Sequence, residues 1–344
     1  MTLRRTLAIT AGIVLALTGL LLVIGWVRGP EARAAAFGAI VSFSMLTATT
    51  RLSVPYVLAA LGGTSSERAG VVNIALEGVL VTGAFASAAV THWTGSPWVG
   101  MAAAVPAGVL IAYVHALATV TFKADQIISG LAVNLLALGA TKFGAKLVWG
   151  KPHSDNIAKL PTIWERDPDA GGLATFVHTL LAEPMVLLTI LLVAAAWLLH
   201  TRTVLGLRLR AVGENAHAVD TLGLPVGGLR YTGVLMSGGF AALGGAWLAF
   251  DVTQFSSGMS AGKGYIAMAA VVFGKWHPLG ATAACLLFGA SEAFQLRLQA
   301  ASVQVPSELV GTLPYLLTIV ALVGLVGRAR PPASLGVAYE KAGA

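Results

Sequence analysis

The stretch Val71–His92 reads VVNIALEGVLVTGAFASAAVTH, and Glu77 is its single residue with a full charge at neutral pH. At 1.5 Å per residue, an α-helix of this length covers about 33 Å, which is enough to cross the hydrocarbon core of a bilayer. Apolar blocks of this kind recur along the chain, whereas a strand of a transmembrane β-barrel alternates apolar and polar residues. The stretch therefore predicts a helix that crosses a membrane.

The composition extends this prediction to the whole chain. Hydrophobic residues make up 56% of the 344 positions and charged residues 11%, against roughly 25% charged residues in soluble domains. A soluble fold of this size would need far more polar surface. Because the sequence shows no internal repeat and no low-complexity linker, we expect an all-α, polytopic helical membrane protein with a single transmembrane domain over 1–344.

Candidate spans follow from hydropathy read in windows of about 19 residues. Arg51 and Pro55 interrupt the second span, so it could be one broken helix or two short pieces. The eighth covers only about 15 Å and could be re-entrant. The first resembles a signal peptide, but its apolar run is longer than a signal core. The spans lie near 7–27, 34–61, 71–92, 98–121, 127–149, 184–200, 231–252, 265–274, 278–297 and 310–327.

Small residues recur every four positions along the seventh of these spans. In lipid, such a stripe lets two helix backbones approach closely. We expect tight helix packing along Gly233, Ser237, Ala241 and Gly245.

The basic residues favour one orientation in the membrane. The formal net charge is +7, but the basic residues do not cluster beside stacking aromatic side chains as in nucleic-acid sites. The positive-inside rule explains them better, because the loop 150–183 holds three basic and five acidic residues. We expect a multi-pass cell-membrane protein with this loop outside and both termini in the cytoplasm. The cytoplasmic pieces then hold Arg4, Arg5, Arg68, Lys123, Arg202, Arg208, Arg210, Arg230, Lys275, Arg328, Arg330 and Lys341.

Asn73 and Glu77 are polar residues at membrane depth. Four residues apart on a helix, they would share a face, and Gly70 and Gly78 beside them would permit close packing or a local break. A carboxylate in hydrocarbon is costly and normally faces the protein interior or water. Two interpretations stay open: Glu77 ties its segment to a neighbouring backbone or basic residue, or the pair lines a substrate pathway.

A second polar stripe runs along the fifth span. Gln126 and Asn134 lie on one face at helical spacing, and Asp125 is placed to cap the start of this helix. Asn134 could contact an uncharged polar solute, or it could bridge two helices.

Signals for catalysis or a bound cofactor are missing from the sequence. The stretch SGMSAGKG at 257–264 resembles a phosphate-binding loop, but Ser257 and Gly264 depart from the Walker pattern. The seven histidines are scattered at spacings unsuited to metal ligation, and Cys285 is the single cysteine. We expect no enzyme activity, and no metal or cofactor held by this chain itself.

The loop of about 201–230, between the sixth and seventh spans, begins with basic residues and continues with GENAHAVDTLG from Gly213 to Gly223. This pattern predicts a short helix with Glu214 or Asn215 near its start and Gly223 as its stop. Because the helix has too little apolar surface to stand alone, it would lie on the membrane surface or dock onto a partner.

Four segments stand out in chain order: ALGGTSSERAGVVNIALEG, DQIISGLAVNLLALG, RAVGENAHAVDTLGLPVGGLRYTGVLMSGGFAALGGAWL and GKGYIAMAAVVFGKWHPLGA. With them the chain resembles the permease subunits of bacterial nucleoside ABC importers, in the larger group that includes ribose and branched-chain amino acid permeases. The likeness runs from about residue 40 to 327. Ala75 departs from it, because relatives often have glycine there.

The resemblance implies a permease of the type II importer fold with about ten helices. It implies two permeases, usually different but related, around one pathway, two cytoplasmic ATPase subunits that bind the ATP, and an extracellular binding protein, often a lipoprotein, that delivers a nucleoside. The helix near 214–223 would couple to the ATPase through Gly213, Glu214, Asn215, Asp220 and Gly223. The pathway would be lined or braced by Asn73, Glu77, Gln126 and Asn134.

Three alternatives remain at this stage. A simple-sugar ABC permease would share the whole architecture. An ion-coupled secondary transporter would use Glu77 as a proton or sodium site, and an integral membrane enzyme would need a catalytic constellation that the sequence lacks.

Overall fold

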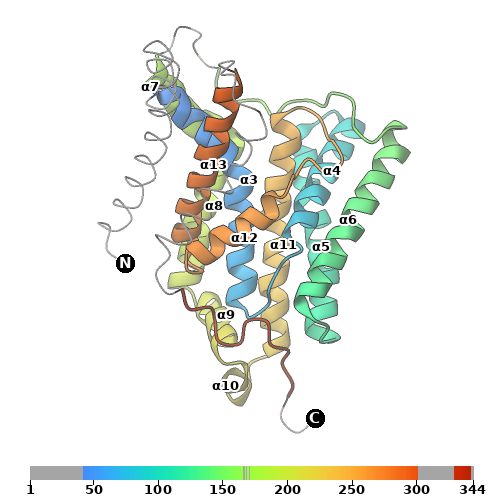
Figure 1. Cartoon of the computed structure of the whole chain (residues 1–344), viewed down its shortest axis with the longest axis vertical. Coiled ribbons are helices and arrows are strands. Elements are labelled where there is room, and N and C mark those ends of the chain that lie inside the picture. The colour runs from blue at the N-terminus through green and yellow to red at the C-terminus, as the bar shows by residue number, and fades with distance from the viewer. Residues whose placement is uncertain (1–41, 166, 168, 170, 301–328, 342–344) are drawn as a thin grey trace, which may run out of the picture. The chain divides into compact units, whose positions relative to one another are not determined.

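The computed structural model describes residues 42–300, apart from 166, 168 and 170, and residues 329–341 (Figure 1). The regular elements in these ranges are helices, which confirms the predicted all-α fold class. In chain order they are α3 (Phe43–Arg68), α4 (Leu76–Thr94), α5 (Pro97–Ala116), the π-helical turn η1 (Leu117–Thr121), α6 (Gln126–Trp149), α7 (Gly172–Ala182), α8 (Pro184–Arg202), α9 (Val204–Glu214), α10 (Ala216–Thr221), α11 (Val226–Asp251), α12 (Lys263–Phe273) and α13 (Pro278–Ala300).

The chain divides into two compact units. In the smaller unit, the guanidinium group of Arg297 donates to the hydroxyls of Ser42 and Ser44 at 3.1 and 2.6 Å. The prediction of one transmembrane domain over the whole chain stays a prediction. The larger unit contains every candidate site residue and comprises Ser53–Glu165, Leu180–Phe288 and Ala329–Ala344.

Among the described residues, five helices are long and apolar enough to cross a membrane, and they match the predicted spans 98–121, 127–149, 184–200, 231–252 and 278–297. The predicted eighth span, 265–274, corresponds to α12, an 11-residue helix. The predicted spans 7–27 and 310–327, and the first part of 34–61, lie outside the described residues. The five helices are Pro97–Thr121, Gln126–Trp149, Pro184–Arg202, Val226–Asp251 and Pro278–Arg297.

The described part of the second predicted span is one continuous helix. α3 runs through Arg51 and Pro55 without a break and continues past the expected end of the span to Arg68. The break comes later, in residues 69–75, which are not helical and which we call the broken segment. The helix predicted from residue 71 is therefore wrong over its first residues, because α4 begins only at Leu76.

The core of the larger unit is built by α4, α5 and α11, which pack against one another. All four residues of the small-residue stripe on α11 are buried, and a β-carbon on Gly245 would overlap the carbonyl oxygen of Leu80 on α4. Such close approach is possible only where the side chain is absent or very small. The predicted packing role of the stripe is confirmed.

The predicted outer loop 150–183 has structure of its own. Residues 150–165 fold back on the loop that follows α11, where the amide of Ser154 donates to the carbonyl oxygen of Phe255 at 2.8 Å. The second half of the predicted loop contains α7. The sequence analysis did not predict this helix, which the apolar run GLATFVHTLLA forms.

Candidate functional site

Glu77 holds the start of α12. Its Oε1 accepts hydrogen bonds from the hydroxyl of Ser260 at 2.6 Å and the amide of Gly262 at 2.7 Å, and its Oε2 accepts one from the amide of Gly264 at 2.8 Å. The side chain is only 6% exposed. The first amides of a helix point outward without partners and carry partial positive charge, so a carboxylate satisfies them well. Of the two interpretations, the tie to a neighbouring backbone is the one that these contacts support.

The stretch that resembled a phosphate-binding loop does bind an anion, but the anion is internal. Gly262 and Gly264 present their amides to the Glu77 carboxylate where a Walker loop would present amides to a phosphate. A β-carbon on Gly264 would lie 2.5 Å from the amide nitrogen of Glu77, so only glycine fits.

Asn134 braces the start of α4 from α6. Its Oδ1 accepts from the amide of Gly78 at 2.7 Å, and its Nδ2 donates to the carbonyl of Ile74 at 2.9 Å and to the hydroxyl of Tyr265 at 3.0 Å. One amide side chain thus satisfies backbone groups on both sides of the helix start and reaches α12 as well. This is the helix-bridging alternative that the sequence left open.

Gln126 and His115 bind the same broken segment at Val72, two residues before Ile74. Gln126 Oε1 accepts from the amide of Val72 at 2.7 Å, while His115 Nε2 lies 3.0 Å from the carbonyl oxygen of Val72. A carbonyl only accepts, so His115 carries its proton on Nε2, and Nδ1 accepts from the hydroxyl of Ser129 at 3.0 Å. The side chain of Asp125 caps α6 as predicted, accepting from two backbone amides.

Asn73 points elsewhere, to α11. Its Nδ2 donates to the hydroxyl of Ser237 at 2.5 Å, so the predicted shared face with Glu77 is wrong. The reason is that Asn73 belongs to the broken segment and not to α4. The Oδ1 atom of this buried side chain has no hydrogen-bond partner within the described part of the chain. Among the side-chain acceptor atoms of the four predicted pathway residues, it is the one without a hydrogen-bond donor in the described part of the chain. It can therefore accept a hydrogen bond from another group.

The predicted short helix of the loop 201–230 exists as α10. Asn215 caps it, with its side chain accepting from the amide of Ala218 at 3.0 Å, and Gly223 ends the turn with a φ of +73°. Asp220 lies within the helix. The sequence interpretation missed α9, the preceding helix, to which Gly213 and Glu214 belong. Its buried positions Gly206, Leu209, Val212 and Gly213 recur at spacings of three and four residues, the period of a helix.

Residues 329–341, which we call the C-terminal strap, connect α9 to the broken segment. The amide of Ser334 donates to the carbonyl of Gly213 at 2.7 Å, and the amide of Gly336 donates to the carbonyl of Gly70 at 3.3 Å. Arg230, fully enclosed at the start of α11, donates to the carbonyl of Val337 at 2.8 Å. Figure 1 shows α9, α10 and this strap together at one end of the larger unit. No sequence pattern indicated the strap.

The predicted residues therefore form two groups. One group, with His115, Ser260 and Tyr265 added by the structure, holds the broken segment and the start of α12. The other lies on α9 and α10 and reaches the broken segment directly, because a β-carbon on Gly213 would overlap the carbonyl oxygen of Arg68 at the end of α3 and would lie 3.3 Å from the amide nitrogen of Gly70. His115 could have been singled out, since it is a polar residue within an apolar span.

A family model described as the branched-chain amino acid transport system permease component matches residues 44–322. The chain belongs to this permease family. Members are transport permeases and not enzymes, and the apolar helices agree with a multi-pass membrane protein.

Three relatives refine the comparison. The Guanosine ABC transporter permease protein NupQ of Bacillus subtilis is 40% identical over 86% of this chain and 96% of its own length. The Nucleoside ABC transporter permease protein NupC of Lactococcus lactis is 34% identical over 84% of this chain and 94% of its own length. TsgC13 of Haloferax volcanii, an ABC transporter permease whose name provisionally assigns it to glucose, is 34% identical over 81% of this chain and 90% of its own length.

Proposed function

We propose that this chain is the transmembrane permease subunit of an ABC importer for nucleosides. The observation that carries the proposal is the 40% identity to the guanosine permease NupQ over nearly the whole of both chains. A neutral nucleoside offers hydroxyls and base edges, which weak polar contacts can guide without a charged binding site. The permease family then makes transport, and not chemistry, the activity of the chain.

The proposal includes partners of three kinds. Two cytoplasmic ATPase subunits bind and hydrolyse the ATP, a second, related permease completes the pathway, and an extracellular binding lipoprotein delivers the nucleoside. Support for the docking of an ATPase comes from α10, a capped helix of six residues with little apolar surface of its own. Leu222, directly after it, leaves 76% of its surface exposed, as expected for a residue that a partner covers.

The route from ATP to the pathway follows contacts within the larger unit. Movement of α10 is transmitted through α9, whose Gly213 touches the end of α3, and through the strap to the broken segment. From there Gln126 and Asn134 connect to α6, and Glu77 connects to α12. In this mechanism Asn73, Glu77, Gln126 and Asn134 brace the pathway wall, so that the wall moves as one piece. ATP supplies the free-energy difference between the two states.

The orientation is part of the proposal, with both termini, α9 and α10 in the cytoplasm. It rests on the excess of arginine and lysine in those pieces. A cytoplasm-active reporter, such as a fluorescent protein that matures only inside the cell, is expected to be active when fused after residue 344. A periplasm- or surface-active reporter is expected to be active when inserted after Gly171. The reverse pattern would contradict the orientation.

The transport prediction is tested in proteoliposomes that contain this chain with its ATPase subunits, its second permease and the binding protein. We expect radiolabelled guanosine or another nucleoside to accumulate only when ATP is present on the side of the membrane that carries the ATPase subunits. A non-hydrolysable ATP analogue, and an ATPase subunit without its catalytic glutamate, are the controls and are expected to give no uptake. Transport of glucose but no nucleoside would assign the chain to sugars, and uptake driven by an ion gradient without ATP would overturn the ABC mechanism altogether.

A further inference from the structure

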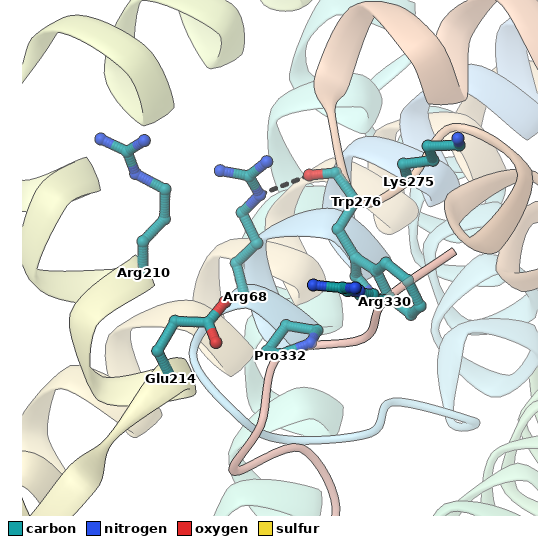
Figure 2. A pocket seen from close by; sticks show the side chains of 7 residues that line it. All are labelled: Arg68, Arg210, Glu214, Lys275, Trp276, Arg330 and Pro332. Carbon is teal, nitrogen blue, oxygen red and sulfur yellow. Dashed lines mark hydrogen bonds between the residues drawn. The ribbon is translucent and has the colours of Figure 1, made fainter. Parts of the chain in front are cut away.

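A pocket of about 270 Å³ lies where four parts of the larger unit meet (Figure 2). The end of α3, the helix α9, the loop between α12 and α13, and the C-terminal strap each contribute to its wall. Figure 2 shows Arg210 and Glu214 of α9 facing Arg68, with the loop residues and the strap residues on the other side. The lining consists of Arg68, Arg210, Glu214, Lys275, Trp276, Arg330 and Pro332.

The pocket carries a large excess of positive charge. The lining contains four cationic residues and one carboxylate, that of Glu214, and this carboxylate accepts a hydrogen bond from the amide of Ala333 at 3.3 Å. Within the described residues, no carboxylate lies within ion-pair distance of Arg210, Lys275 or Arg330. Cations held together without counter-ions repel one another, and an anion between them removes that repulsion.

The positive charge of the pocket also affects the pKa of a neighbouring histidine. His277, in the loop between α12 and α13, has its pKa lowered by burial first and then by the positive charge of Arg68. Both causes disfavour the charged imidazolium. His277 therefore adds no further charge near neutral pH, and the arginines and the lysine dominate the pocket.

The wall of the pocket is fixed in place. Lys275 and Trp276 both have positive φ, +56° and +54°, a conformation that costs free energy for residues other than glycine. Trp276 is held there from two sides: its indole donates to the carboxylate of Glu67 at 2.5 Å, and its carbonyl oxygen accepts from Nε of Arg68. This bond uses one nitrogen of Arg68 and orients the guanidinium, whose terminal nitrogens have no hydrogen-bond partner among the described residues.

We propose that this pocket binds a phosphate group. Guanidinium groups bind phosphate oxygens with paired hydrogen bonds, and phosphate carries enough charge to neutralise several cations in a small volume. The phosphate can belong to the headgroup of an anionic phospholipid, since basic pockets at the ends of transmembrane helices bind such headgroups, or to a soluble phosphate. In both cases the ligand bridges α9 and the strap to α3, and so stabilises the contacts through which the coupling loop reaches the broken segment.

The test compares two double variants of the full chain in the transporter complex. Arg210→Gln with Arg330→Gln removes two pocket cations. Arg208→Gln with Lys341→Gln is the matched control, because it removes two exposed cations from the same helix and the same strap that do not line the pocket. One arm counts phosphatidylglycerol retained by the complex in native mass spectrometry after delipidation. The other arm measures binding of inorganic phosphate by calorimetry in nanodiscs of phosphatidylcholine alone.

In at least one arm we expect the unmodified complex to bind the phosphate ligand. The pocket variant is expected to bind it at least about tenfold more weakly, because charge-assisted hydrogen bonds are lost. The affinity of the control variant is expected to stay within about twofold of that of the unmodified complex. Lipid retention alone would identify a headgroup, and calorimetric binding alone a soluble phosphate. Absence of binding in both arms, or an equal loss in both variants, would overturn the proposal. Unchanged binding together with loss of the ATPase subunits would assign the pocket to an acidic partner surface instead. If the double variant does not fold, Arg330→Gln alone, on the strap, carries the same comparison.

Discussion

Replacing Glu77 by glutamine is expected to give a transporter that assembles poorly and hardly moves solute. The two carboxylate oxygens accept three hydrogen bonds from Ser260, Gly262 and Gly264. Glutamine keeps one acceptor, and its NH₂ group would face an amide donor at the other. A buried hydrogen bond to a charged group contributes about 1.5–3 kcal/mol, so we expect the free energy of unfolding to fall by about 3 kcal/mol. Thermal unfolding of the purified complex measures this loss.

Uptake per folded transporter is expected to fall by about tenfold or more in the same variant, since about 1.4 kcal/mol already changes a conformational equilibrium tenfold. The matched control is Glu165→Gln, which removes an exposed carboxylate and is expected to change stability by less than about 0.5 kcal/mol. The comparison also separates two mechanisms. If Glu77→Gln folds normally and transports normally, α12 does not depend on Glu77. If the variant folds normally, and if its loss of uptake depends on the ion gradient across the membrane, Glu77 acts as an ion site.

Replacing Gly213 by alanine is expected to separate ATP hydrolysis from transport. The added methyl group would overlap the carbonyl oxygen of Arg68 and would lie 3.3 Å from the amide nitrogen of Gly70. Both are backbone atoms, so they cannot move aside as a flexible side chain would, and overpacking of this kind costs about 1–3 kcal/mol. α9 must shift away from α3, and the contact that carries movement from α10 to the broken segment is lost. We expect the ratio of ATP hydrolysed to nucleoside transported to rise about tenfold.

Gly227→Ala provides the control for this variant. Gly227 lies in the first turn of α11, in the same loop region, and the nearest atom to an added β-carbon, on Val120, is 3.9 Å away. We expect normal coupling there, measured as ATPase activity and uptake in the same proteoliposomes. Equal coupling ratios in Gly213→Ala and in the unmodified complex would show that the path through the end of α3 carries no movement.

The sequence predicted the helices that depend on hydrophobicity and local capping. The apolar runs that became α5, α6, α8, α11 and α13 were long enough to be recognised, since one helix of that kind satisfies all its backbone groups within itself. Asp125 and the short helix α10 followed from capping residues that act within three positions of the helix start. The small-residue stripe on α11 also predicted its own packing, because side-chain size is a property of the sequence.

The broken segment shows what the sequence could not determine. Residues 71–75 are as apolar as a helix, and their hydropathy predicted one. They remain unwound because Gln126 and His115 satisfy Val72 and Asn134 satisfies Ile74 and Gly78, from helices more than 40 residues away in sequence.

From the sequence alone we could place Glu77, Gln126 and Asn134 in membrane helices and identify them as polar residues that need partners. Only the tertiary structure decided which partners they have: the groups at the start of α12, the backbone of the broken segment, and the first turn of α4. Burial forces every polar group to find a hydrogen-bond partner, but the identity of that partner depends on which distant segments the fold brings within about 3 Å.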